Sequence, residues 1–224
     1  MQYTFALRTI YPYLGTLWQA ALVTLYLSLL GIAISLVIGA GVAVMRRSRS
    51  MPVRFLGAAY VEVMRNTPLL VILYIVYFAL PQTGLRLSSF TAALIGLSLN
   101  SAGYMAEILR AGLIAIPHGQ REAAASQGMS GLQAFRYIVF PQVIRIVYAP
   151  LGNQFIAVIL ASSLASVIAV EDVASWMQTI GSTSFRFFET FVVAAGVYLV
   201  LCQSVNLGRI AIGRALFKHL RSAR

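Results

Sequence analysis

Residues 117–141, PHGQREAAASQGMSGLQAFRYIVFP, form a polar, helix-forming segment in a chain that is otherwise strongly apolar. Its first helix formers are followed by Gly128, the residue type that commonly closes a helix with a positive φ angle. Ser130 and Gln133 have the spacing of a capping box, which marks the start of a second helix. A proline inside a helix disrupts its hydrogen bonds, so we expect the second helix to end at Pro141. The segment therefore predicts a hairpin of two short helices joined at a glycine.

The rest of the chain has the composition of a membrane protein. Of its 224 residues, 59% are hydrophobic and only 10% are charged, whereas soluble domains carry about 25% charged residues. Backbone N–H and C=O groups in lipid must be satisfied within each segment, and a helix does this. We therefore predict an all-α membrane protein whose apolar segments cross the bilayer.

Hydropathy predicts five transmembrane helices. In the first of them, small residues recur every four positions at Gly31, Ser35, Gly39 and Ala43, a pattern that favours close helix packing. Before the last span we expect an outer loop, with a short helix along the membrane interface. The predicted spans are 14–45, 55–80, 87–108, 146–170 and 190–208, and the outer loop is 171–189.

The distribution of basic residues predicts the orientation of these spans. A net charge of +11 would suggest a nucleic-acid partner in a soluble protein. Here Arg46, Arg47 and Arg49 follow the first span, and a basic tail follows the last. Because cytoplasmic loops carry an excess of Lys and Arg, we expect the N-terminus outside and the C-terminus inside. The charge is then explained by topology in membrane lipid, with no nucleic-acid partner.

Two polar helical faces lie within or beside the predicted second and third spans. Ionisable groups in spans are costly, and their default interpretation is functional. One reading is that they line a path for a polar solute, and the other is that they neutralise one another near the ends of the spans, with Arg110 within reach of Glu107. The residues on these faces are Glu62, Arg65, Asn66, Thr67, Asn100, Tyr104 and Glu107.

Several kinds of chemistry have no candidate residues. The only lysine, Lys218, is not followed by the Ser or Thr that a P-loop needs. The two histidines, His118 and His219, are isolated in polar flanking segments, so we expect no metal site. No histidine within a predicted span could act as a base for a serine nucleophile. We therefore predict that the chain is not an enzyme and has no catalytic residue, cofactor or metal of its own.

The hairpin segment carries a motif formed by Glu122, Ala123, Ala124, Gly128, Phe135 and Pro141. This motif resembles the EAA loop of ABC importer permeases. The runs YMAEILR at 104–110 and RNTPLL at 65–70 look like the branch that imports polar amino acids, the histidine/glutamine/glutamate/arginine/opine type. The resemblance extends over about residues 14–214, nearly the whole chain.

The resemblance implies a fold, a location and partners. It implies one transmembrane permease domain over 1–224, like that of type I ABC importers, in the bacterial cytoplasmic (inner) membrane. The motif residues, within a coupling loop at about 113–141, would dock on a dimer of cytoplasmic ATPase subunits that bind ATP and Mg²⁺. A periplasmic or lipid-anchored binding protein would deliver the polar or charged amino acid, and a second permease subunit would complete the path.

The chain departs from its relatives at one point. They place a lysine before a Thr-Ser-Leu triplet, whereas Leu160 and Ala161 precede Ser162, Ser163 and Leu164 here. This difference favours a heterodimer of two permeases over a homodimer. Two other classes stay open from composition alone: a self-contained secondary transporter or channel for small polar solutes, and a structural membrane anchor. The secondary transporter would need ion-coupling groups or an internal repeat.

The orientation is open to a direct test. A reporter fused at Arg224 should behave as cytoplasmic, and a reporter inserted near Ser182 should behave as extracytoplasmic, because the basic flanks fix the direction of insertion. Two reporters suit this test: alkaline phosphatase, which is active only outside the cytoplasm, and a fluorescent protein that is fluorescent only inside it. The opposite result at either position would refute the five-span topology.

Overall fold

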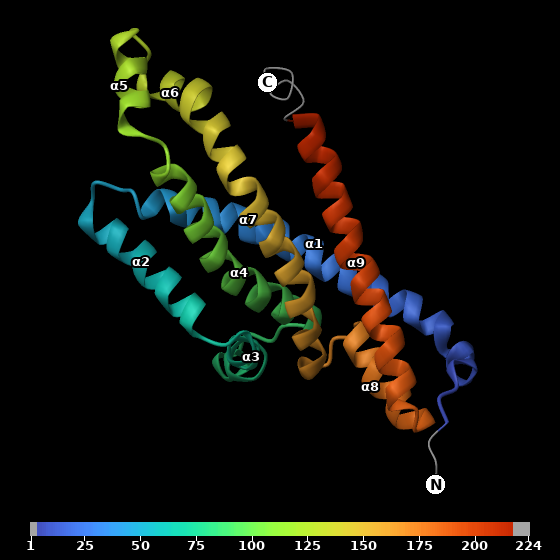
Figure 1. Ribbon diagram of the computed structural model, residues 1–224. Helices are drawn as coiled ribbons and strands as arrows, with labels where there is room; N and C mark the ends of the chain where they lie inside the picture. Colours follow the sequence, from blue (N-terminus) through green and yellow to red (C-terminus); the bar gives the residue numbers. More distant parts are fainter. Residues whose placement is uncertain (1–3, 217–224) are drawn as a thin grey trace. The chain divides into compact units, whose positions relative to one another are not determined.

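The computed structural model describes residues 4–216, and this part of the chain is almost entirely helical and contains no strand (Figure 1). The basic tail residues Lys218, Arg221 and Arg224 lie outside the described range. Short 3-10 or π segments extend several helices: Leu7–Tyr13, Ile75–Ala79, Leu80–Thr83, Phe135–Val139 and Ser162–Ile168. The α-helices are α1 Leu14–Met45, α2 Met51–Asn66, α3 Leu69–Tyr74, α4 Ser89–Ile114, α5 His118–Ser126, α6 Gly131–Ala134, α7 Phe140–Ala161, α8 Val173–Ser184 and α9 Phe187–Leu216.

Four of the five predicted spans are confirmed as single helical stretches that are long and apolar enough to cross a membrane. The predicted second span is instead broken at Thr67 and Pro68, and it counts as a fifth crossing only if α2 and the stretch that begins with α3 form one span. Pro68 has no amide hydrogen, which explains why the helix stops there. The four unbroken stretches are Leu7–Met45, Ser89–Ile114, Gly131–Ile168 and Phe187–Ala215.

The prediction that Pro141 ends a helix is wrong. Helical residues run on from α6 through the π segment Phe135–Val139 into α7, so the second arm of the hairpin is the start of a long stretch. At the junction the Phe140 amide donates to the Phe135 carbonyl, five residues back. Such a wider turn changes the register of the backbone hydrogen bonds just before the proline. The Ile138 carbonyl accepts a hydrogen bond from the side chain of Gln142, whose Nε2 lies 2.8 Å away. The helix can therefore accommodate Pro141.

Residues 4–216 form two compact units. Unit 1 comprises residues 4–33, 67–98 and 156–216, and unit 2 comprises residues 34–66 and 99–155. Helices α1, α4 and α7 contribute residues to both units. The single domain expected over 1–224 stays a prediction.

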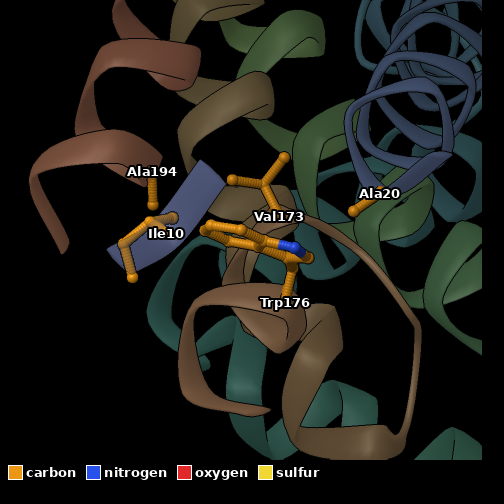
Figure 2. Close-up of a cluster of buried hydrophobic side chains, with 5 residues drawn as sticks. All are labelled: Ile10, Ala20, Val173, Trp176 and Ala194. Atoms are coloured by element: carbon orange, nitrogen blue, oxygen red, sulfur yellow. The ribbon is translucent and has the colours of Figure 1, made fainter. Parts of the chain in front are cut away.

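Unit 1 has a core around Trp176 of α8 (Figure 2). Its ring lies among Ile10, Ala20, Val173 and Ala194, which come from four different parts of the chain. The indole nitrogen donates to the Tyr13 carbonyl at 3.3 Å and to Thr16 Oγ1 at 3.1 Å. The predicted helix in the outer loop is therefore present as α8, and its Trp176 is buried in the core of unit 1.

Polar contacts fix both ends of the α8–α9 hairpin within unit 1. The carboxylate of Glu189, which is fully buried, accepts a hydrogen bond from the Ala6 amide at 2.9 Å. Arg186 donates to the Thr4 carbonyl at 2.9 Å. At the other end, the Val173 amide donates to Thr24 Oγ1 at 3.1 Å. The N-terminal segment and α1 are thereby attached to the predicted outer loop.

Unit 2 depends on glycines that let helices approach closely. A Cβ atom on Gly39 of α1 would lie 2.9 Å from Met105 Cβ on α4. A Cβ atom on Gly112 of α4 would overlap Val147 of α7. All four residues of the small-residue ridge are buried, as the sequence predicts, and Ser35 and Ala43 are almost completely inaccessible. Gly39 and Gly112 thus let α1, α4 and α7 approach one another closely within unit 2.

Asp172 caps the start of α8 with one oxygen and buries the other without a hydrogen-bond partner among the described residues. Asp172 Oδ1 accepts from the Ser175 amide at 2.8 Å, whereas Oδ2 is inaccessible to solvent and unsatisfied. Burial raises the pKa of this carboxyl to about 6, although backbone amides favour the ionised form. Compared with the unfolded chain, the folded state therefore favours the protonated carboxyl.

We predict that this carboxyl makes stability depend on pH. Its pKa is raised on folding, so its contribution is complete below about pH 4, near the value of a free Asp side chain, and is lost as pH rises through about 6. Asp172→Asn keeps a capping oxygen and cannot ionise, so above pH 7 it should be more stable by on the order of 1–3 kcal/mol. The measurement is the thermal unfolding midpoint in detergent between pH 4.5 and 7.5.

The exposed neighbour Glu171 provides the control, and Glu171→Gln should keep the wild-type pH profile. An Asp172→Asn midpoint that follows the wild-type value across the whole pH range would show that Asp172 is ionised without cost in the folded protein.

Candidate functional site

The hairpin predicted from residues 117–141 is present, and its corner has the predicted conformation. Gly128 has a φ angle of +77°. The Gly128 amide donates to the Ala125 carbonyl at 2.9 Å, and the Met129 amide donates to the Ala124 carbonyl at 3.1 Å. This pair of bonds is the Schellman motif, which satisfies the last carbonyls of α5 and requires a left-handed residue. The corner is therefore set by Gly128.

The predicted capping box is also present. The backbone N–H of Gln133 donates to Ser130 Oγ at 3.3 Å, and the backbone N–H of Ser130 donates to Gln133 Oε1 at 2.8 Å. Two of the amides that open a helix, which have no partner within it, are satisfied in this way. Because both arms of the hairpin are capped by local bonds, its shape does not need a partner.

Helix α5 has an exposed face and a face turned toward its own unit. Glu122 is 69% exposed, and its carboxylate lies 2.9 Å from His118 Nδ1 on the preceding turn. Ala123 is exposed as well, whereas Ala124 is buried at 5% exposure. The exposed face can contact a partner, and Ala124 packs within the chain. Of the other predicted docking residues, Gly128, Phe135 and Pro141 are exposed.

The second group of candidate residues lies where α2 ends against α4. The Met64 carbonyl would normally accept from the amide four residues later, but that residue is Pro68, which has none. Asn100 of α4 takes this place, because its Nδ2 donates to the Met64 carbonyl at 2.7 Å. The break at Thr67 and Pro68 therefore leaves a backbone carbonyl in need of a partner, and Asn100 supplies it.

The next carbonyl on α2 is satisfied by a second side chain of α4. Tyr104 Oη donates to the Arg65 carbonyl at 3.2 Å, and the Arg65 guanidinium lies over the Tyr104 ring, 5.5 Å from its centroid. Tyr60 adds a bond in the opposite direction, from its hydroxyl to the Leu99 carbonyl at 2.7 Å. Sequence analysis missed Tyr60, although a tyrosine seven residues before a helix break could have suggested it.

Glu62 and Asn66 of α2 bond to each other rather than to α4. Asn66 Nδ2 donates to Glu62 Oε1 at 2.7 Å, one turn apart on the helix. Glu62, Arg65 and Asn66 are all exposed in the described chain, and Thr67 is half-buried. Their shared face, expected from the spacing, is thus an exposed polar surface at the end of α2.

Glu107 belongs to a separate charge cluster. Its carboxylate accepts from Arg110 Nε at 3.1 and 3.2 Å, as the sequence predicts, and it also pairs with the Arg110 Nη2 and Arg46 Nη1 atoms. Arg46 comes directly after α1 and is 61 residues away in sequence, so spacing could not reveal this pair. Asn100 and Tyr104 share a helical face with Glu107 but contact α2 instead.

Within residues 4–216, no three or more His, Cys, Asp or Glu side chains are grouped so that they could hold a metal ion. The polar groups at the end of α2 and along α4 satisfy backbone carbonyls or one another. The exposed groups lie on two surfaces, the outer face of α5 and the end of α2.

Comparison with known proteins places these features in a family context. The family described as "Binding-protein-dependent transport system inner membrane component" matches residues 31–217. The probable glutamine ABC transporter permease protein GlnM of Bacillus subtilis (strain 168) is 40% identical over 185 residues, which are 83% of this chain and 86% of the relative. The glutamine transport system permease protein GlnP of Escherichia coli (strain K12) is 36% identical over 194 residues, 86% of this chain and 89% of the relative.

Solved structures agree with the sequence relatives. A chain from the "Crystal structure of an amino acid ABC transporter with histidines" superposes with a TM-score of 0.87 at 34% identity, covering 95% of this chain and 100% of that one. The MetNI methionine ABC transporter in an inward-facing form has a TM-score of 0.74 at 18% identity, which shows a shared fold. The predicted all-α fold of a type I importer permease is confirmed.

We predict that the Asn100 contact stabilises the fold. Asn100→Ala leaves the Met64 carbonyl without its partner, so the free energy of unfolding should fall by roughly 1–3 kcal/mol. Tyr104→Phe should cost less, because that hydroxyl bond is exposed. Thermal or denaturant unfolding of the purified protein measures both. Asn153→Ala, an exposed asparagine on α7, is the matched control, and an equal loss in that variant would remove any special role for Asn100.

Proposed function

The chain belongs to the family of binding-protein-dependent transport system inner membrane components, and from this premise we propose that it carries polar or charged amino acids across the bacterial cytoplasmic membrane. The chain is a permease subunit of an ABC importer. The observation that carries the amino-acid cargo is the 40% identity with a relative named as a glutamine permease, over 83% of this chain. The best superposition described above, with an amino acid ABC transporter, supports the same substrate class.

We propose that the outer face of α5 contacts the ATPase partner. Glu122 and Ala123 are exposed there, and the glycine corner and capping box hold the helix in one shape. Glu122 already has a neighbour in His118, so a basic group on the ATPase would join an existing pair. Ala124 is buried, and its small side chain supports α5 from within unit 2. Gly128, Phe135 and Pro141 complete the exposed part of the proposed coupling loop.

The energy for transport would come from the partner. In this proposal a dimer of ATPase subunits binds ATP with Mg²⁺ and hydrolyses it, and the permease performs no covalent step. Closure of the ATPases would move the hairpin as a rigid body, because its two arms are fixed by local hydrogen bonds. The helix that begins at Gly131 continues into α7, so a movement of the hairpin is transmitted to a membrane-spanning helix.

Other partners follow from the family. A binding protein in the periplasm or anchored to lipid would deliver the amino acid, and a second permease would share the path. We favour a non-identical second permease, because Leu160 and Ala161 stand where the family resemblance implies a lysine, before the Ser162–Leu164 triplet. Leu160 is 51% exposed, so a lysine at or beside this position could have reached outward.

We propose that the solute path is lined chiefly by the exposed end of α2, namely Glu62, Arg65 and Asn66, with Thr67 beside them. Asn100 and Tyr104 hold that end in place through the Met64 and Arg65 carbonyls, and Glu107 neutralises Arg46 and Arg110. The Asn100→Ala variant separates the two roles. A positioning role lowers stability and uptake together, whereas direct contact with the solute raises the KM for uptake at unchanged stability.

The coupling role predicts a strong effect of Gly128→Val. A Cβ atom at Gly128 meets nothing within 4 Å, so the cost is backbone strain alone, roughly 1–2 kcal/mol and more for a β-branched residue. Strain of this size should reorient the hairpin and reduce the ATPase that copurifies in mild detergent by about 5- to 30-fold. Uptake in membrane vesicles should be lost while insertion in the membrane is retained, because no span changes.

Two matched variants isolate the cause. Gly128→Asn should keep most of the coupling, because asparagine tolerates the left-handed conformation, and Gly119→Val tests added bulk at an open position with ordinary φ. Glu122→Ala should weaken attachment only mildly, since an exposed ion pair contributes about 1 kcal/mol or less. Normal ATPase attachment and uptake in Gly128→Val would refute the docking role. Absence of any copurifying ATPase from the wild-type complex would favour a self-contained transporter.

A further inference from the structure

A cavity of about 670 Å³ lies behind the hairpin, entirely within unit 2. The residues that form it come from the end of α1, the loop that follows, the start of α2, the end of α4 and the inner side of α5, α6 and the π segment. Of the residues proposed to contact the ATPase, Phe135 also lines this cavity, whereas Glu122, Ala123, Gly128 and Pro141 do not. Representative lining residues are Val44, Arg47, Leu113, Arg121, Met129 and Val139.

Two arginines line this cavity without an acidic partner. Arg47 and Arg121 make no ion pair with any Asp or Glu in the part of the chain that the structure describes. Partial burial of its guanidinium and, to a lesser extent, the neighbouring charge of Arg121 lower the pKa of Arg47. By contrast, the adjacent Arg46 shares the Glu107 carboxylate with Arg110. The chain neutralises one arginine pair and leaves the other to an external anion.

The rest of the cavity wall indicates what kind of anion fits. Val44, Leu113 and Val139 are apolar, and Val139 is almost completely buried. A free phosphate ion could pair with the two guanidinium groups, but it would leave the apolar walls without contacts. An acidic protein segment would have to enter the space between the hairpin and the helix ends. Val44 and Leu113 also lie one residue before the ends of α1 and α4, so the cavity opens at a membrane surface. The positive-inside pattern predicts that this is the cytoplasmic surface.

We propose that this cavity binds one anionic phospholipid, with its phosphate between Arg47 and Arg121 and the start of an acyl chain along Val44, Leu113 and Val139. Basic pockets at the cytoplasmic ends of transmembrane helices are suited to anionic head groups. The lipid would bridge the loop after α1 and helix α5, and would relieve the repulsion between the two arginines. It would thereby hold the hairpin against the ends of α1 and α4. The proposal does not depend on which solute the protein carries.

Native mass spectrometry of the full-length chain in detergent tests the proposal, with phosphatidylglycerol and phosphatidylcholine titrated separately. The wild type should retain one phosphatidylglycerol more tightly than phosphatidylcholine. Arg47→Gln and Arg121→Gln should each weaken that binding about 5-fold, because a basic residue beside an anionic lipid contributes about 1 kcal/mol. The double variant should bind phosphatidylglycerol about 30-fold more weakly than the wild type if the two contributions add. Arg49→Gln, an exposed arginine in the same loop that does not line the cavity, should bind like the wild type.

The remaining outcomes decide against the proposal. Equal retention of the two lipids, or unchanged phosphatidylglycerol binding in the double variant, overturns it. Displacement of the lipid by millimolar inorganic phosphate would identify a free-phosphate site. Lost ATPase copurification with unchanged lipid binding would assign both arginines to the ATPase contact. The variants Arg47→Lys and Arg121→Lys should keep most of the affinity, and a wild-type thermal midpoint in every variant confirms that a loss of binding is not a loss of fold.

Discussion

The break after Asn66 leaves the Met64 and Arg65 carbonyls without the amides that would satisfy them in a continuous helix. In a membrane, water cannot take that place at low cost, so the partners must come from the protein. Asn100 and Tyr104 supply them from one face of α4, and Tyr60 strengthens the same contact in the other direction. The position of the exposed polar end of α2 depends on these three hydrogen bonds.

Charged side chains in unit 2, like the backbone carbonyls, find partners within the protein. Glu107 lies on α4 near the arginine-rich end of α1, and one carboxylate serves both Arg46 and Arg110. This cluster joins α1 to α4 where the glycines have already brought their backbones close. Arg47 and Arg121 are treated differently, because no carboxylate in the described chain reaches them. The cavity that both arginines line therefore has a positive end and apolar walls. These features are complementary to the phosphate and the acyl chain of an anionic lipid.

The hairpin connects these features to transport. It is held by bonds between neighbouring residues, so it can move as one piece, and its second arm is continuous with a membrane-spanning helix. The same short element thus has an outer face for a protein partner and an inner face toward the proposed lipid. A change at Gly128 would alter both faces, whereas changes at Glu122 or Arg121 would alter one.

The family, the membrane class and the local shape of the hairpin were all predictable from the order of the residues. The Gly128 corner, the Ser130–Gln133 box and the Glu107–Arg110 pair were predictable because each joins residues within a few positions, where backbone geometry alone sets the distance. The bounds of α1 were predictable for a similar reason, since apolarity ends where the arginines begin. The break at Pro68 was visible, but its partners were not.

The contacts between side chains of different helices could be seen only in the folded chain. Asn100 bonds to a carbonyl 36 residues away, and Arg46 reaches a carboxylate 61 residues away. Such contacts depend on helix packing, which one sequence does not specify. The continuation of the helix through Pro141 and the burial of Ala124 also required the structure, because a wider turn and a neighbouring surface override local preference. The hairpin's bonds are local, so sequence could predict them, whereas its two faces are defined by what packs against them.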